Sequence, residues 1–347
     1  MQSYQENKNY NAYTVQVNED LQNLSEYNKE MIQRYQSKIN DRKLIIMFNS
    51  ELRSLDFINY LDINKLELEN CKNIIPKFES LIITKLEIID CEIKSIKDFQ
   101  LQNLEDLTIY NVSDKLESKT LTLEIARFQQ LNELYLYKWK IDISPLSQMT
   151  RLTKLGLIQC ELRSTEAVRQ LVNLEMLYLD GNEEIDIVSL QYLNNLTILS
   201  LLQCNLKSLE PLRPLTQLKE LNISWNSVVY LQPISDLKQI TKLNAENNKI
   251  IDQESIQQHP NFKNFNLRNQ EQPTKEELKI TDILRDISNP TTFLKQICKK
   301  SRQIKYQYIN FRQKVSQLLQ ETYIRHEQFL IQVVVLSQIM NVFEGCQ

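Results

Sequence analysis

Apolar residues recur along residues 42–270 in one pattern that returns about every 22 positions. Its clearest copy reads Leu196-x-x-Leu199-x-Leu201-x-x-Cys204-x-Leu206-x-x-Leu209-x-Pro211-Leu212. The alternation in Leu199-x-Leu201 has the period of a strand, so it predicts two leucines facing a core and their neighbours facing out. Proline before the last leucine predicts a short helix, because proline presets φ in the first helical turn. Pro145 and Pro233 repeat this signal.

The position filled by Cys204 forms a ladder through the chain. Its members are Ser50, Cys71, Cys91, Val112, Trp139, Cys160, Asn182, Cys204, Asn226, Asn248 and Gln270. Asparagine at this position is expected to hydrogen-bond backbone groups of the turn after each strand, and cysteine is a small residue that tolerates burial. One interval is 27 residues long because of an insertion within residues 113–128. Its apolar residues Leu121, Leu123, Ile125 and Phe128 predict a longer helix on the convex side.

These repeats resemble the leucine-rich repeat class found in internalins and in the leucine-rich regulator of protein phosphatase 1. The exit, residues 259–267, is also similar to that of large protist families of intracellular leucine-rich repeat proteins. The resemblance implies an α/β solenoid, a curved leucine-rich repeat horseshoe with a parallel sheet on its concave face. It also implies a non-catalytic protein that binds a partner on that sheet. No partner-contact residue carries over, because the shared motif consists of core positions.

Three regions are predicted along the chain. Residues 1–41 form a loose N-terminus and a helix that caps the first repeat, with Leu21, Leu24, Met31 and Ile32 at helical spacing. Residues 42–272 hold about eleven repeats, and residues 273–347 form a C-terminal helical extension. Thr274-x-x-Glu277 is a capping box that opens the first helix of this extension. A second apolar rhythm between residues 292 and 343 skips near 321–325, which fits either a coiled coil with a stutter or a helical hairpin.

The outward positions of the predicted strands give the concave face two polar ends and an apolar middle. At the N-terminal end, Glu67, Glu69 and Glu87 are expected to be ordinary solvated carboxylates. The partner-binding candidates in the middle are Tyr110, Tyr135, Tyr137, Ile158, Met176, Tyr178, Ile198, Leu202 and, at a strand exit, Trp225. Gly156 is expected to leave a dip between Tyr135 and Tyr178 that a partner side chain enters. Such a patch marks an interaction surface, although coverage by the chain's own C-terminal helix and scattered surface aromatics are alternatives.

Charge is distributed unevenly along the chain. From residue 292 onward there are eight Lys/Arg and three Glu, which gives a net charge of +5. Because the whole chain has a net charge of −3, the part before residue 292 carries −8. One hypothesis is that this basic tail binds the phosphates of RNA or an anionic membrane surface. A charged face on a helix that packs or self-associates is the simpler interpretation, and we favour it over nucleic-acid binding.

Composition and motifs argue against catalysis, metals and cofactors. Three glycines leave no Gly-rich phosphate loop, and His259 and His326 lack a nearby Ser or Cys with an Asp. Six cysteines without a secretory signal indicate reduced thiols in a cytoplasmic protein. The most apolar stretch, residues 329–343, spans 15 residues and is interrupted by polar ones, so no membrane span is expected.

The sequence therefore predicts a cytoplasmic, non-catalytic scaffold that binds a protein partner on its concave face and self-associates through its C-terminal helix. Two alternatives remain at this stage. Regulation of a protein phosphatase is implied by the resemblance alone. Binding to an anionic surface follows from the basic tail.

Overall fold

The computed structural model describes residues 42–47, 56–71, 78–91, 95–111, 116–118 and 120–278, together with Glu30, Gln33 and Gln36. The chain divides into two compact units, Met1–Pro273 and Thr274–Gln347. Nearly all of the described residues belong to the first unit, which contains the repeats.

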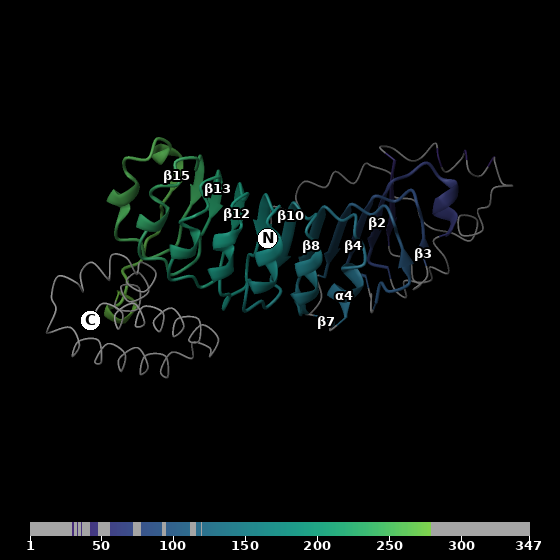
Figure 1. Ribbon diagram of the computed structural model, residues 1–347, viewed down its shortest axis with the longest axis horizontal. Coiled ribbons are helices and arrows are strands. Elements are labelled where there is room, and N and C mark those ends of the chain that lie inside the picture. The colour runs from purple at the N-terminus through teal and green to yellow at the C-terminus, as the bar shows by residue number, and fades with distance from the viewer. Residues whose placement is uncertain are drawn as a thin grey trace, which may run out of the picture. The chain divides into compact units, whose positions relative to one another are not determined.

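Eleven parallel strands lie side by side in one open sheet, and they follow one another in chain order (Figure 1). They are β1 (Lys43–Met47), β2 (Lys65–Glu69), β4 (Lys85–Ile89), β6 (Asp106–Tyr110), β8 (Glu133–Tyr137), β10 (Lys154–Ile158), β11 (Met176–Tyr178), β12 (Ile198–Ser200), β13 (Glu220–Asn222), β14 (Lys242–Asn244) and β15 (Phe265–Asn266). Equivalent positions pair across the sheet, as Leu155 does with Leu134 and with Leu177. One strand per repeat in a parallel sheet confirms the predicted leucine-rich repeat solenoid.

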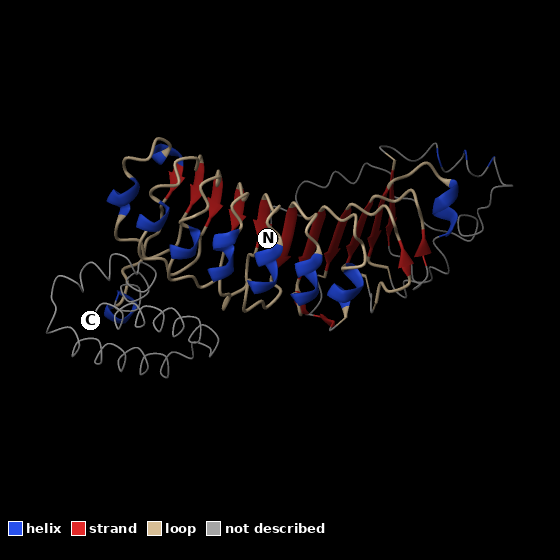
Figure 2. Ribbon diagram, viewed as in Figure 1, coloured by secondary structure: helices blue, strands red, loops and turns tan. Residues whose placement is uncertain are grey.

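Short helices form a second row beside the row of strands (Figure 2). They are η1 (Asp56–Tyr60), α4 (Leu121–Ile125), η2 (Ser144–Gln148), η3 (Glu166–Gln170), η4 (Val188–Tyr192), η5 (Glu210–Leu212), η6 (Gln232–Ile234), η7 (Gln253–Ile256) and η8 (Phe262–Asn264). Pro145, Pro211 and Pro233 stand in the first turns of η2, η5 and η6, which confirms their predicted role.

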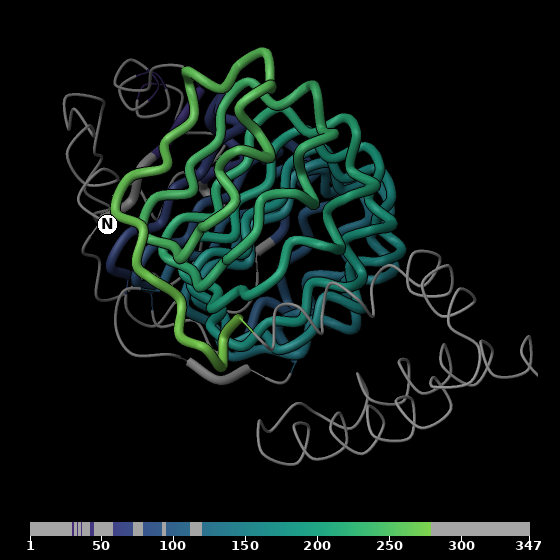
Figure 3. The backbone as a smooth tube through the Cα atoms, turned by 90° about the vertical axis from the view of Figure 1, so that its left-hand side faces the viewer, coloured from purple at the N-terminus to yellow at the C-terminus, as the bar shows by residue number. Residues whose placement is uncertain are grey.

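The core lies between the two rows, and successive coils of the chain stack one behind another (Figure 3). In β8 the side chains of Leu134 and Leu136 are fully buried, while those of Tyr135 and Tyr137 are half-buried. Leu199 and Leu201 of the clearest repeat are likewise buried. The predicted alternation of core-facing and outward-facing residues is therefore confirmed.

Asparagine at the ladder position joins neighbouring repeats through their backbones. Asn226 Oδ1 accepts hydrogen bonds from the N–H groups of Cys204 and Leu206 at 3.0 and 2.9 Å. Its Nδ2 donates to the carbonyls of Leu201 and Ile223 at 2.8 and 2.9 Å. One buried amide thus bonds four backbone groups, of which the Ile223 carbonyl also accepts from Asn248. The role predicted for asparagine is confirmed.

Gln270 makes the corresponding bonds at the end of the ladder. It accepts from the N–H of Ile250 at 3.0 Å and donates to the carbonyl of Ala245 at 3.0 Å. The last ladder member therefore departs from asparagine in residue type but keeps its bonding.

Cysteine at the ladder position forms weaker hydrogen bonds with the backbone of the same turn. The Cys160 thiol donates to the carbonyls of Leu136 and Ile158 at 3.4 and 3.5 Å. Burial raises the pKa of the Cys160 and Cys204 thiols to about 12. These thiols stay protonated at neutral pH. All four described cysteines, Cys71, Cys91, Cys160 and Cys204, are buried free thiols.

The residue before each ladder position often has a left-handed backbone, which the leucine pattern alone did not reveal. These residues are Asn70, Asp90, Lys138, Gln159, Gly181, Gln203, Trp225, Asn247 and Asn269. A positive φ favours glycine and asparagine and is unusual for a bulky side chain. We call this set the left-handed column.

The insertion differs from its prediction. The α-helix α4 spans five residues, no more than the neighbouring 3-10 helix η2. The inserted chain instead forms the strand β7 (Leu116–Ser118), which pairs with β9 (Trp139–Ile141). A longer helix was therefore wrong, because part of the extra length is taken up by this second small sheet. A third small sheet pairs β3 (Phe78–Glu79) with β5 (Phe99–Gln100).

The predicted helical ends are described only in part. Gln36 is helical, and its side chain bonds the backbone N–H of Asp62 at 2.7 Å. The rest of the predicted N-terminal cap lies outside the described residues. Thr274 and Glu277 form the predicted capping box, with the Glu277 N–H donating to Thr274 Oγ1 at 3.2 Å and the Thr274 N–H donating to Glu277 Oε2 at 2.9 Å. The remaining extension, with its coiled-coil or hairpin alternatives, lies outside the described residues.

None of the described helices is long and apolar enough to cross a membrane.

Candidate functional site

The face of the eleven-stranded sheet turned away from the core is called the open face below. Its middle carries a group of half-buried side chains, here called the aromatic patch. The members are Tyr110, Tyr135, Tyr137, Ile158, Met176, Tyr178, Ile198 and Leu202. They come from β6, β8, β10, β11, β12 and the residues that directly follow β12. Because these strands are neighbours in the sheet, the patch is contiguous.

Two tyrosine pairs organise the aromatic patch. Tyr110 and Tyr137 are register partners on β6 and β8, and their ring centroids lie 5.0 Å apart at an interplanar angle of 51°. The rings of Tyr135 and Tyr178 lie 6.1 Å apart at 41°. These distances fall in the range of favourable aromatic pairs. The rings are therefore held in place by one another before any ligand binds.

Gly156 lies under the Tyr135 ring. A Cβ at Gly156 would lie 2.4 Å from Cδ1 of Tyr135, so only glycine leaves room for the ring in this position. The ring reaches across β10 toward Tyr178, two strands away. The predicted open dip was wrong: the missing side chain is replaced by the Tyr135 ring, which joins the tyrosines into one surface.

Charged groups at the border of the patch are paired. Lys154 Nζ lies 2.5 Å from Glu133 Oε1, and this hydrogen bond raises the pKa of Lys154. Asp180 Oδ1 accepts from Ser200 Oγ at 2.6 Å and from the Leu202 N–H at 2.9 Å. Burial raises the pKa of Asp180 despite these bonds. An apolar centre with a bonded polar rim is the usual anatomy of a protein interface.

Ile89 extends the aromatic patch and was not among the predicted residues. It is half-buried on β4 and is the register partner of Tyr110. Its alternation with Lys85 and Glu87 was the signal in the sequence, since all three share the outward parity of β4.

The N-terminal end of the open face differs from its prediction. The side chain of Glu67 is 2% exposed, and its Oε2 lies 2.6 Å from Lys43 Nζ. Three lysines on adjacent strands, Lys43, Lys65 and Lys85, are in register and border a hollow of about 190 Å³. Describing Glu67 as an ordinary solvated carboxylate was wrong, because it is buried and paired with Lys43 of the neighbouring strand.

The C-terminal end of the open face is polar, as predicted, and its amides bond one another. Asn222 Nδ2 donates to Ser200 Oγ at 3.3 Å, and Asn266 Nδ2 donates to Asn244 Oδ1 at 3.0 Å. These side chains use part of their bonding capacity within the protein. This end therefore offers a more hydrophilic surface than the aromatic patch.

Trp225 occupies a different place from the other candidates. Its side chain is 62% exposed, and it lines a groove of about 370 Å³ at the edge where the strands end. Gln203 and Asn247, its counterparts in the adjacent repeats, also line this groove. No member of the aromatic patch does so.

The described histidine and the described metal-ligating residue types were the remaining candidates for chemistry. His259 is buried, its Nε2 lies 3.1 Å from the carbonyl of Leu237, and its Nδ1 accepts from the N–H of Asn261 at 3.2 Å. Both ring nitrogens are thus engaged with backbone. Among the described residues, no group of three or more His, Cys, Asp or Glu is placed to hold a metal ion.

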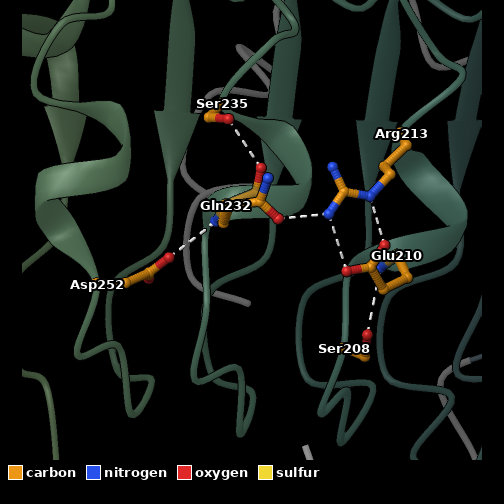
Figure 4. Close-up of polar contacts among 6 residues, drawn as sticks. All are labelled: Ser208, Glu210, Arg213, Gln232, Ser235 and Asp252. Carbon is orange, nitrogen blue, oxygen red and sulfur yellow. Dashed lines mark hydrogen bonds and ion pairs between the residues drawn. The ribbon is translucent and has the colours of Figure 1, made fainter. Parts of the chain in front are cut away.

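A polar cluster lies in the row of helices and joins adjacent helices by hydrogen bonds (Figure 4). Glu210 is buried, and Arg213 Nη2 donates to its Oε1 at 3.0 Å and also to Gln232 Oε1. Asp252 Oδ2 accepts from the N–H of Gln232 at 2.9 Å, which caps the start of η6. The Glu210–Arg213 pair and its neighbours bond mainly to one another and to helix backbone, so we assign this cluster a structural role.

A parallel sheet with one strand per repeat and an asparagine or cysteine ladder defines the class: leucine-rich repeat proteins. No family model matches the chain, and no curated protein matches it. Among solved structures, the chain is similar to internalin C2 of Listeria monocytogenes, with 23% identity over 52% of this chain and 76% of that chain and a TM-score of 0.45. A leucine-rich repeat protein of Leptospira interrogans matches at 21% identity over 65% and 72% of the two chains, with a TM-score of 0.39.

The mouse RP105/MD-1 complex matches at 20% identity over 66% of this chain, with a TM-score of 0.52. The alignment spans 42% of that longer chain. At these identities, the likeness is one of fold: the protein has the leucine-rich repeat fold shared by these neighbours.

Proposed function

We propose that this protein is a non-catalytic scaffold that binds a protein partner through the aromatic patch. The observation that carries the proposal is the presence of two tilted tyrosine pairs on an otherwise charged and amide-rich sheet. Tyrosine supplies a large contact area at low entropic cost, and it is enriched in the residues that dominate binding energy. A contiguous apolar patch with a polar rim on a sheet face is typical of an interaction site.

The fold supports this proposal by making the outward positions independent of the core. In β8, Tyr135 and Tyr137 alternate with buried leucines, so the outward residues can suit a partner without altering the core. One structural neighbour is a chain of the mouse RP105/MD-1 complex, so it is solved with a protein partner. A solenoid that presents an extended sheet provides such a binding surface.

The test is affinity capture from the source cells with three versions of the full chain. They are the wild type, a triple variant Tyr135→Thr/Tyr137→Thr/Tyr178→Thr, and the matched control Lys242→Thr, which changes an outward residue of β14 outside the patch. Threonine keeps the strand preference while removing the ring. The partner found by mass spectrometry is then purified, and its Kd is measured by calorimetry.

We expect the triple variant to weaken binding at least about a hundredfold, since hot-spot aromatics contribute about 2 kcal/mol or more each. The Lys242→Thr control should bind as the wild type does. Circular dichroism and the thermal midpoint check that the variants fold. Equal Kd values for wild type and a folded triple variant would sink the proposal.

The two alternatives rest on other grounds. Binding to an anionic surface, and self-association, depend on residues 292–347, which lie outside the described chain and stay predictions. Regulation of a protein phosphatase rests on the sequence resemblance alone. A cytoplasmic location is likewise a prediction from the sequence.

A further inference from the structure

The groove beside Trp225 is separate from the aromatic patch and has a lining of its own. Its volume of about 370 Å³ lies within the range of small-molecule sites. Such sites are usually lined by apolar side chains, whereas Trp225 is the one large apolar residue lining this groove. An indole ring surrounded by polar groups suits a ligand that is itself largely polar.

The backbone of Trp225 is in an unfavourable conformation for its side chain. Its φ is +56°, in the left-handed region where glycine and asparagine are favoured and bulky residues are rare. The adjacent members of the left-handed column, Gln203 and Asn247, have φ of +56° and +55°. The same conformation thus recurs in the adjacent repeats, and tryptophan is an unfavourable residue type for it. A strained, exposed aromatic in a groove points to function.

Three amide side chains around Trp225 have no bond within the described part of the chain. Gln203, Asn205 and Asn247 line the groove, and none of their side chains bonds another described residue. By contrast, Asn222 and Asn266 on the open face bond other side chains. Each free amide offers two donors and one acceptor side by side.

The floor of the groove is fixed by the asparagine ladder. Asn226 and Asn248 line it, but their amides are committed to backbone carbonyls, such as those of Leu201 and Ile223 at 2.8 Å each. The backbone N–H of Trp225 donates to the carbonyl of Glu246 at 2.9 Å. The backbone that carries the indole is thus held by hydrogen bonds, which lowers the entropic cost of binding.

We propose that this groove binds a neutral carbohydrate, with Trp225 as the platform under a sugar ring. The C–H groups of a sugar face contact the negative face of the indole, and its hydroxyls both donate and accept, as the three amides do. The charged lining consists of Glu183, Glu271 and Lys249, so both signs are present and neither a strong anion nor a strong cation is favoured. The scarcity of apolar lining disfavours a lipid or an apolar peptide side chain.

The experiment follows the indole N–H signals of the full chain by ¹H–¹⁵N NMR. The chain has two tryptophans, of which Trp139 is 3% exposed and Trp225 is 62% exposed, so the two signals report a buried and an open site. The probes are the hexasaccharides of cellulose, chitin, laminarin, starch and mannan, each up to about 10 mM. A hexa-lysine peptide serves as the cationic probe.

We expect at least one hexasaccharide to shift the Trp225 signal and leave Trp139 in place. Trp225→Asn should weaken that binding by about tenfold or more, measured by calorimetry, while its thermal midpoint equals or exceeds that of the wild type, because asparagine tolerates the left-handed turn. The matched control Gln159→Asn, in the same column outside the groove, should bind as the wild type does.

Three results would overturn the carbohydrate assignment. They are the absence of any shift with all five hexasaccharides, unchanged binding in Trp225→Asn, and a Trp225 shift with hexa-lysine alone. Failure here leaves the proposed function intact, because the groove and the aromatic patch share no residue.

Discussion

The central and C-terminal repeats share one core but treat their open faces differently. The strands β6, β8 and β10 are five residues long, whereas β12, β13 and β14 have three. In β13 the side-chain oxygen of the outward Asn222 accepts a hydrogen bond from the backbone N–H of Ser224 at 3.1 Å. This local bond competes with hydrogen bonding of the same N–H to the neighbouring strand. In β8 the outward Tyr135 makes a ring contact instead.

Outward side chains thus set the character of the surface, whereas strand length does not follow them, since β11 has three residues and carries Tyr178. The ladder position differs in another way, because two residue types alternate along it. Asn182 and Asn226 supply a full amide, while Cys160 and Cys204 supply a thiol that is a weak donor and a weak acceptor. Asparagine therefore bonds the turn more strongly than cysteine does. The following changes test this difference, in order of decreasing effect.

Asn226→Ala should cause the largest loss of stability. It removes the partners of the buried N–H groups of Cys204 and Leu206 and of the Leu201 carbonyl, while the Ile223 carbonyl keeps its bond from Asn248. With about 1 kcal/mol for each of the three buried groups left unpaired, we expect a loss of about 3 kcal/mol. Urea unfolding followed by circular dichroism measures it. A loss below about 1 kcal/mol would show that the ladder amide does not join the repeats.

Gly156→Ala should destabilise the centre through a clash rather than a lost bond. Its Cβ would lie 2.4 Å from the Tyr135 ring, and displacing that ring should cost about 2 kcal/mol. The same variant should weaken partner binding, because the Tyr135–Tyr178 pair is broken. The double variant Tyr135→Thr/Gly156→Ala is the control. Its loss should be smaller than the sum of the two single losses, and strict additivity would contradict the contact.

Cys160→Ala should cost only about 1 kcal/mol, since two weak sulfur bonds and a small volume are lost. Measured beside Asn226→Ala under the same conditions, it gives the contrast between the two ladder types directly. Equal losses for the two variants would mean that the thiol holds its turn as firmly as the amide.

Asp180→Asn should have the smallest effect, with a size that depends on pH. Burial raises the folded-state pKa of Asp180 above its ordinary 3.8, so the folded state binds a proton more readily than the unfolded state. Wild-type stability from this group therefore falls as pH rises through that window. Asparagine keeps the acceptor for Ser200 and Leu202 without the charge. Thermal midpoints at pH 4 and pH 7 should show an advantage of the variant that is larger at pH 7; the reverse order would contradict the shift.

The repeated core could be predicted because its residues recur at fixed spacing. Leu199, Leu201 and Pro211 each have counterparts in several repeats, and Asn226 supplies both amide donors and an acceptor for a turn that needs them. The outward parity of Tyr135 and Tyr137 followed from the same register. Features that depend on a single neighbour across strands could not be predicted in this way.

Three residues illustrate that limit. The position of the Tyr135 ring over Gly156 depends on a side-chain rotamer, and the burial of Glu67 depends on Lys43 from another strand. The groove at Trp225 depends on the left-handed column. Its members lie between core positions, so the spacing of the apolar residues does not reveal their backbone conformation. Each feature arises from contacts between repeats, which the repeat pattern does not specify.

The most direct test of the central claim is photo-crosslinking from the open face. A benzoylphenylalanine is placed at Tyr137, in the aromatic patch, or at Lys242, the outward position on β14, and each full chain is irradiated in the source cells. The account predicts a discrete adduct with one protein from position 137 and none from position 242. An adduct absent from 137, or formed equally from both positions, would contradict the assignment of the aromatic patch as the partner-binding surface.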